Sequence, residues 1–162
     1  KDSGSAVIII VNKWDLVEDK KTNTMNEYRK YLAASFPFIS WAPVLFVSAL
    51  TKQRVKNVFE FIDTSQRNRT VTITQEELDD FLMQATRRHK PVKGKGPRAP
   101  RILGIKQVAT RPPRFHLVIK SKRSDTISKS YIRYLENQLR EKFGLTGTPI
   151  RVGVRLARSV SK

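Results

Sequence analysis

The stretch Ala6-Val7-Ile8-Ile9-Ile10-Val11-Asn12-Lys13-Trp14-Asp15 decides the fold class of the first part of the chain. Residues 6–11 are an apolar run rich in β-branched side chains, which predicts a strand buried on both faces, as in a parallel sheet. A polar turn, residues 12–15, follows it directly. Because open α/β sheets bind ligands at the carboxyl ends of their strands, this turn is a candidate binding site.

An Asn-Lys-x-Asp turn in this position can recognise guanine. The Asp15 carboxylate can accept hydrogen bonds from N1–H and the 2-amino group of the base, whereas adenine would leave the charge unpaired. The Asn12 amide can hold the neighbouring polar edge of the base, and the Lys13 stem can lie over its face. The alternative is an ordinary polar turn with an Asx-turn at Asn12 and a solvated Lys13.

A second turn is expected to complete this pocket. Residues 43–47 predict another buried strand, and Ser48-Ala49-Leu50 follow it with a backbone N–H available to the base oxygen. One helix is predicted from a Thr24–Glu27 capping box to just before Pro37, and another near residues 54–66. The order strand, helix, strand, helix predicts a parallel sheet.

The second part of the chain carries most of the positive charge. Residues 1–65 hold 9 Lys+Arg and 7 Asp+Glu, whereas residues 66–162 hold 23 and 7, a net charge of +16. This balance favours a polyanionic partner over a basic but inert surface. A membrane is disfavoured because no helix pairs a basic polar face with a Trp/Phe/Leu face, and no apolar run is long enough to span a bilayer.

Secondary structure in this part is predicted to be mixed. A Thr74–Glu77 capping box opens a helix to about residue 88, and Gly144 caps a helix over residues 128–143. Strands are predicted at residues 102–110, 114–120 and 150–156. The chain has no Cys, which excludes a disulfide framework or a thiolate metal site, and we predict neither a metal site nor a catalytic residue here.

The stretch 87–101 is expected to be a mobile basic loop, because it combines seven Lys+Arg with three prolines and two glycines. Phosphates of nucleic acid are its expected partners, together with arginines of the neighbouring strands. The candidate contacts are Arg87, Arg88, Lys90, Lys93, Lys95, Arg98, Arg101, Arg111, Arg114, Arg151 and Arg155.

These motifs together resemble the Der, or EngA, family of bacterial ribosome-assembly GTPases. Asn12, Lys13 and Asp15 match the guanine-specificity motif, and Ser48-Ala49 match the last GTPase motif. The stretches 108–113, 131–137 and 147–151 resemble the family's KH-like domain. The resemblance implies an α/β fold, with part of a P-loop GTPase domain (a parallel sheet with helices) at 1–68, an α+β KH-like domain at 70–157 and a basic tail at 158–162.

The resemblance also implies function and partners. It implies GTP or GDP as the ligand, Mg²⁺ in the complete protein with ligands outside this chain, and contact with the missing GTPase portion. The partners it implies are the large ribosomal subunit and its rRNA, with no membrane, in the bacterial cytoplasm or in a mitochondrial or plastid matrix.

Two motifs of the complete machinery do not occur in this sequence. There is no Gly-x-x-x-x-Gly-Lys-Ser/Thr loop, so we expect a fragment that does not hydrolyse GTP alone. The junction 125–130 lacks the Gly-x-x-Gly of a typical KH domain, which favours phosphate contacts over recognition of single-stranded bases. The alternative is a non-catalytic RNA-binding module in which the GTPase remnant is only a scaffold.

Overall fold

The computed structural model describes residues 4–95 and 98–157, and its contacts divide the chain into two units. The first unit comprises the residues up to Arg69 together with Thr146–Pro149. The second comprises Thr70–Leu145 and the residues from Ile150 onward. The predicted basic tail 158–162 lies outside the described residues.

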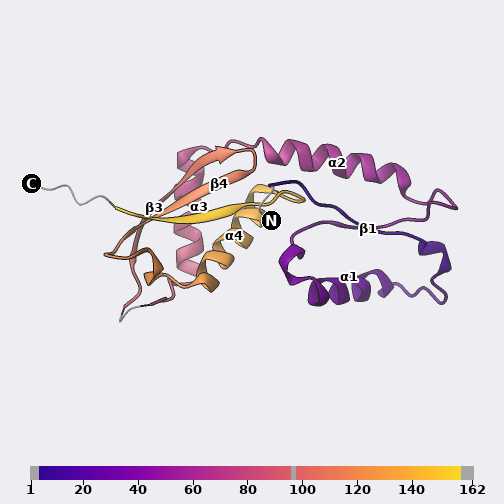
Figure 1. The fold of residues 1–162 in the computed structure, drawn as a ribbon, viewed down its shortest axis with the longest axis horizontal. Coiled ribbons are helices and arrows are strands. Elements are labelled where there is room, and N and C mark those ends of the chain that lie inside the picture. Colours follow the sequence, from indigo (N-terminus) through magenta and orange to yellow (C-terminus); the bar gives the residue numbers. More distant parts are fainter. Residues whose placement is uncertain (1–3, 96–97, 158–162) are drawn as a thin grey trace, which may run out of the picture. The chain divides into compact units, whose positions relative to one another are not determined.

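The first unit is built on a small parallel sheet. Strand β1 (Ile9–Val11) pairs with β2 (Val44–Phe46), with Ile9 opposite Val44 and Val11 opposite Phe46. Helix α1 (Thr24–Ser35) connects the two strands and α2 (Val55–Arg69) follows β2, so that the helices flank the sheet (Figure 1). The parallel pairing confirms the predicted α/β class.

Two local predictions for this unit are wrong. Strand β1 is not buried on both faces, because Ile10 is 47% exposed; a sheet of two three-residue strands offers little surface for helices to cover. Thr24 does not cap α1. Asn23 occupies the cap position, but its side chain makes no capping bond to the helix backbone. Thr24 Oγ1 instead accepts the Lys21 N–H at 2.8 Å, so the preceding loop competes successfully for the hydroxyl.

Apolar side chains remain exposed on both helices of the first unit. No residue of α1 is buried, Tyr31 is 69% exposed, and Phe59 on α2 is 67% exposed. The apolar side chains of these two helices are therefore not covered within the first unit.

The segment Thr146–Pro149, which the sequence analysis placed in the second domain, has its contacts with the first unit. The buried Thr148 hydroxyl donates to the Ser65 carbonyl at 3.0 Å, and the Val7 N–H donates to the Gly147 carbonyl at 3.0 Å. Gly147 has φ +72°, and a Cβ added there would lie 3.1 Å from Ser65 Cβ. Both the conformation and the crowding therefore require glycine at position 147.

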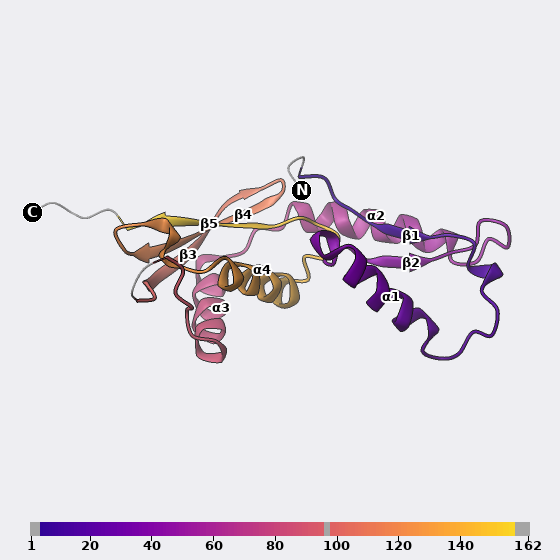
Figure 2. The ribbon, with the colours of Figure 1, turned by 60° about the horizontal axis from the view of Figure 1, so that its bottom comes forward.

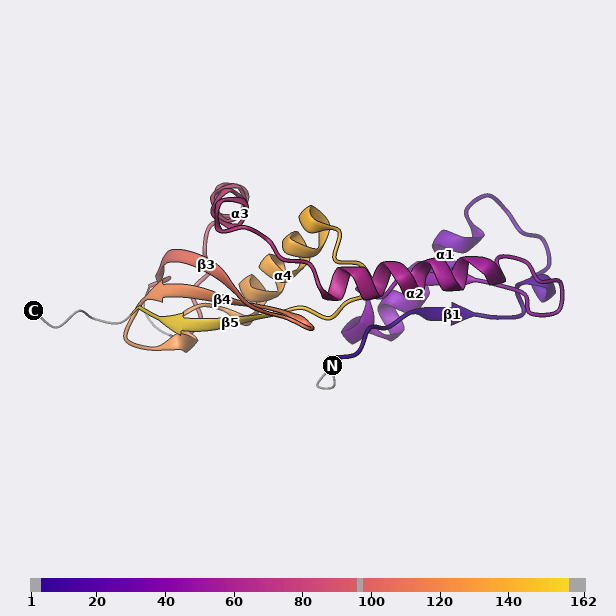
Figure 3. The same ribbon diagram turned by 90° about the horizontal axis from the view of Figure 1, so that it is seen from above.

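The second unit is a three-stranded sheet with two helices on one face. The strand order is β3 (Arg101–Thr110), β4 (Pro113–Lys120), β5 (Arg151–Leu156), with β3 antiparallel and β5 parallel to β4. Figures 2 and 3 show α3 (Gln75–Arg88) and α4 (Lys129–Phe143) on the same side of this sheet. The predicted order helix, strand, strand, helix, strand is confirmed.

The core of the second unit lies between the sheet and these helices. Alternate residues of β4, namely Phe115, Leu117 and Ile119, are wholly buried. They pack in one cluster with Leu135 and Leu139 of α4 and with apolar residues of α3. The period-two burial of β4 leaves Arg114, His116, Val118 and Lys120 on the opposite face of the sheet.

Helix α3 begins with the predicted capping box. The Glu77 N–H donates to Thr74 Oγ1 at 3.2 Å, and the Thr74 N–H donates to Glu77 Oε2 at 2.8 Å. The N–H and hydroxyl of Thr74, both donating to this carboxylate, lower the pKa of Glu77 below its ordinary value of 4.5. Glu77 therefore stabilises the folded state above that value, and this contribution is lost as the pH falls through the lowered pKa.

Thr74→Ala is expected to lower the free energy of unfolding by about 1 kcal/mol near neutral pH, because it removes the hydroxyl that accepts the Glu77 N–H and donates to the Glu77 carboxylate. The loss should shrink as the pH falls through the lowered pKa of Glu77, because the protonated carboxyl no longer accepts these bonds well. Urea unfolding over a series from neutral to acidic pH measures it. Thr24→Ala is the matched control, with the same sequence pattern but no cap; an equal loss in both variants would contradict the assignment.

Candidate functional site

Two polar turns meet at the carboxyl ends of β1 and β2. The Val47 N–H donates to the Val11 carbonyl at 2.9 Å, and the Trp14 N–H donates to the Val47 carbonyl at 3.0 Å, which extends the strand pairing into the turns. Asn12 Oδ1 then accepts the N–H of Ala49 at 3.1 Å and that of Lys13 at 2.7 Å. One amide oxygen thus connects both motifs that the sequence analysis singled out.

A buried tryptophan anchors the first turn. Trp14 is 2% exposed, and its ring centroid lies 4.4 Å from that of Phe46 and 5.3 Å from that of Tyr28. Lys13 next to it has φ 60°, in the left-handed region, and starts the short 3₁₀ helix η1 (Trp14–Leu16). The anchored ring and the tight turn leave the side chains of Asn12 and Lys13 exposed.

Asp15 and Ser48 bring a charge to the same place. Ser48 is wholly buried, and its Oγ accepts the Thr51 N–H at 3.1 Å, which leaves its own proton for Asp15. The Ser48 hydroxyl is the largest cause of the lowered pKa of the Asp15 carboxyl, so this group is anionic at neutral pH. Asp15 Oδ1 is buried and has no hydrogen-bond partner among the described residues. A donor-bearing ligand would satisfy this acceptor.

One detail of the expected pocket differs. The sequence analysis left the Ala49 N–H available to a base oxygen, but this N–H donates to Asn12 Oδ1. The difference arises because the Asn12 side chain reaches from the turn after β1 to the turn after β2. The spacing of residues within either motif does not reveal this contact. A base oxygen would have to share or replace that hydrogen bond.

The predicted basic residues fall into separate groups in the second unit. Arg87 and Arg88 end α3, Lys90 follows it, and Arg111 lies in the turn between β3 and β4. Arg114, Arg151 and Arg155 lie on the face of the sheet that the helices do not cover. Lys93, Lys95, Arg98 and Arg101 belong to the segment that leads into β3.

The uncovered sheet face carries several basic side chains around the apolar Val118, and we call these basic residues the open face: Lys106, Arg114, His116, Arg151 and Arg155. Arg114 pairs directly with Arg151, and Lys106 pairs with His116. The three strands contain no Asp or Glu. Like charges placed opposite one another destabilise a sheet, so this arrangement lowers the stability of the folded chain by itself. An anionic partner bound to this face would relieve the repulsion.

The expectation of a mobile loop at 87–101 is wrong for part of it. Lys93 forms an isolated β-bridge with Ile127, and the Gly94 N–H donates to the Thr126 carbonyl at 2.7 Å. Composition could not reveal this, because the partner segment lies more than thirty residues further along the chain. The expectation for residues 96–97 lies outside the described residues.

Sequence reasoning also missed four basic residues. Lys106 shares the open face, and Lys120, Lys122 and Arg123 lie beside the segment that leads into β3. The signal was present in the cluster Lys120-Ser121-Lys122-Arg123, directly after a strand.

The junction at 125–130 has its own capped geometry in place of a glycine loop. The 3₁₀ helix η3 (Ser124–Thr126) precedes α4, and Ser128 Oγ caps that helix by accepting the Tyr131 N–H at 3.1 Å. This helix start is closed by a side chain.

Comparison with known proteins identifies the family. The model of the KH-domain-like, C-terminal domain of EngA bacterial GTPase enzymes matches residues 72–155. The chain belongs to the EngA family. Among curated relatives, a GTPase Der of Acetivibrio thermocellus is 42% identical over 154 residues, covering 95% of this chain and 34% of that protein. A GTPase Der of Finegoldia magna is 39% identical over 150 residues, covering 93% and 33%.

This EngA-family chain spans about one third of the length of the curated relatives it matches. Its KH-like domain, as matched, contains the whole of the sheet β3–β5 except the end of β5, and both helices that cover it. In residues 4–95 and 98–157, no helix is both long and apolar enough to cross a membrane. The same residues hold no group of three His, Asp or Glu side chains placed to ligate a metal ion.

Proposed function

We propose that this chain supplies the guanine-recognition end and the RNA-contacting domain of an EngA-family GTPase that acts in assembly of the large ribosomal subunit. The observation that carries the nucleotide half is Asn12 Oδ1 joining the two turns beside the buried, unpartnered Asp15 Oδ1. An anionic acceptor held in a fixed turn suits the N1–H and 2-amino donors of guanine.

Each residue of the turns has a separate role in this proposal. Asp15 accepts from the base, and Ser48 keeps Asp15 ionised. Asn12 holds the second turn in place through Ala49, while the exposed Lys13 stem can cover the face of the base. GTP or GDP is the ligand, and the groups that hold Mg²⁺ and the phosphates belong to the rest of the complete protein.

The exposed apolar faces of α1 and α2 support a contact between this unit and the rest of that GTPase domain. The open face supports the RNA half, because phosphate contacts need only a dense array of Lys and Arg. The cellular setting we propose is the bacterial cytoplasm.

Asp15→Asn in the complete protein is expected to weaken GTP binding by about 10-fold to 100-fold, because an unsatisfied or mismatched buried hydrogen bond costs about 1–3 kcal/mol. The amide pairs better with xanthine, so XTP should bind the variant more tightly than it binds the wild type. Calorimetric titration with GTP and XTP measures both changes.

Glu18→Gln is the matched control, since it removes one exposed carboxylate three residues away and should leave both affinities unchanged. Wild-type GTP affinity with continued rejection of XTP in Asp15→Asn would contradict the role of Asp15. That result, with RNA binding intact, would favour the alternative in which the first unit is only a scaffold for an RNA-binding module.

A further inference from the structure

A second basic surface lies at the open end of the hairpin formed by β3 and β4, where β3 begins and β4 ends. It is an open groove of about 570 Å³, and six of the ten described residues that line it are Lys or Arg, with no Asp or Glu among those ten. Arg101 and Lys120, which pair across the hairpin, lie on the same side of the sheet as the open face, and the other four basic residues come from the loops beside it. The six basic residues are Lys95, Arg98, Arg101, Lys120, Lys122 and Arg123.

Backbone hydrogen bonds hold one wall of the groove in place. The segment that enters β3 is joined to the loop before α4 by a short antiparallel pairing around the bridge between Lys93 and Ile127. Arg101 and Lys120, which pair at the end of the hairpin, form the floor between the two segments. The bonds run from the Gly94 N–H to the Thr126 carbonyl (2.7 Å), from the Lys95 N–H to the Asp125 carbonyl (2.8 Å), and from the Ser128 N–H to the Val92 carbonyl (3.0 Å).

Gly94 makes this pairing possible. A Cβ at this position would lie 2.7 Å from the Ile127 carbonyl oxygen and would also collide with the carbonyl oxygen of Asp125. Backbone atoms on the opposing strand cannot rotate away as a side chain can. Any larger residue at position 94 must therefore push the two walls apart.

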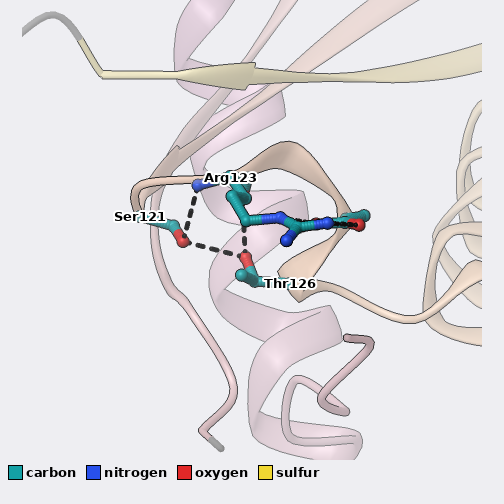
Figure 4. Close-up of polar contacts among 4 residues, drawn as sticks. Ser121, Arg123 and Thr126 are labelled. Carbon is teal, nitrogen blue, oxygen red and sulfur yellow. Dashed lines mark hydrogen bonds and ion pairs between the residues drawn. The ribbon is translucent and has the colours of Figure 1, made fainter. Parts of the chain in front are cut away.

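The other wall is fixed by its own side chains. The Thr126 hydroxyl lies 3.0 Å from Ser121 Oγ and 2.9 Å from the Arg123 carbonyl oxygen, and Ser121 Oγ also accepts the Arg123 N–H (Figure 4). Arg123 is held by Asp125 through two hydrogen bonds, Nη2 to Oδ2 at 2.6 Å and Nε to Oδ1 at 3.0 Å. This Arg123 contact lowers the pKa of Asp125, which remains anionic at neutral pH.

Asp125 forms a direct ion pair with only one of the six basic residues, Arg123, and the charge of Lys95 also contributes to the lowered pKa of Asp125. Within residues 4–95 and 98–157, no ion pair involves Lys95, Arg98, Arg101, Lys120 or Lys122. Several cations that converge on a concave, preformed surface repel one another unless an anion lies between them. A concave groove admits a single polyanionic strand more readily than a flat lipid surface.

We propose that this groove is a preformed site for consecutive phosphates of an RNA backbone, set in place by Gly94 and adjoining the open face at one end. The proposal rests on the RNA half of the proposed function. It assigns a defined binding path to residues that otherwise count only as general positive charge.

The test measures binding of the chain to a single-stranded uridine 12-mer across a salt series. The charge variant Arg98→Gln/Lys120→Gln/Lys122→Gln should flatten the slope of log affinity against log salt by about two units, since each phosphate contact contributes about 0.7 for single strands. The control Lys30→Gln/Lys56→Gln/Arg133→Gln removes the same charge from exposed positions elsewhere and should change the slope by less than about half a unit. An equal change in both variants would overturn the site.

The second comparison changes shape without changing charge. Gly94→Ala should flatten the slope by about one unit, which is less than the change expected for the charge variant. Gly104→Ala, whose added methyl would meet no atom within 4 Å, should bind as wild type does. Circular dichroism checks that each variant is folded. If Gly94→Ala binds like Gly104→Ala while the charge variant weakens, the groove is not a preformed site.

The outcomes distinguish failure of the groove from failure of the proposed RNA-binding function. Wild-type chain that binds anionic vesicles but no RNA would overturn both the groove and the RNA half of the proposed function. Wild-type binding of RNA with a normal slope in the groove charge variant would overturn the groove alone.

Discussion

Phe115→Ala is expected to lower the free energy of unfolding of the second unit by about 3–5 kcal/mol. Phe115 is wholly buried at the centre of β4, with Gln107 of β3 on one side and Val152 of β5 on the other. Removing its ring loses transfer free energy and leaves a cavity that strands bonded on both sides cannot close. Such a loss is a large part of the total stability of a domain, about 5–15 kcal/mol.

Urea unfolding followed by circular dichroism measures this change. Val118→Ala is the control, because Val118 lies on the same strand but on the opposite, partly exposed face. It should cost less than about 1 kcal/mol. Equal losses for the two variants would show that the assigned burial of β4 is wrong.

Arg114→Gln/Arg151→Gln/Arg155→Gln is expected to weaken RNA binding by about 100-fold at about 0.1 M salt. If each side chain touches one phosphate, the slope of log affinity against log salt falls by about two units or somewhat more. Between about 1 M salt, where the electrostatic contribution vanishes, and about 0.1 M salt, a slope change of two units amounts to about 100-fold in affinity. The loss should be similar for different RNA sequences, because phosphate contacts do not distinguish bases directly.

A stability measurement on the same variant separates function from folding. Arg114 and Arg151 lie directly opposite one another, so removing their charges relieves a like-charge repulsion within the sheet. Weaker RNA binding in a variant that unfolds more easily would point to damaged folding instead. An unchanged salt slope in a well-folded variant would contradict the assigned role of the open face.

The features predicted correctly from sequence depend on signals within a few residues. The box from Thr74 to Glu77 closes within one turn, and Gly144 adopts the left-handed cap conformation with φ 64°. Alternation along β4 identified its buried face because side-chain direction in a strand has a period of two. Parallel pairing of β1 with β2 followed from the helix between them.

The errors arise where two local solutions compete or where a partner is distant in sequence. Thr24 has the same spacing to an acid as Thr74, but the Lys21 N–H takes its hydroxyl. The pinned part of the basic loop depends on backbone atoms of residues 125–128, which no composition argument could supply. The convergence of Asn12 with Ala49 could be anticipated from parallel strands, whereas guanine binding at these residues stays a prediction.

The segment Thr146–Pro149 determines how the chain can be taken apart. The backbone passes from one unit to the other at residues 69–70, again at 145–146 and a third time at 149–150. A protease that cuts only between Arg69 and Thr70 would therefore not release the two units as separate products, since the first would still be joined through the Thr148 hydrogen bond and the flanking backbone. Expression of the second unit as a stable separate domain therefore needs a redesigned connection from α4 to β5 as well as a new N-terminus at about residue 70.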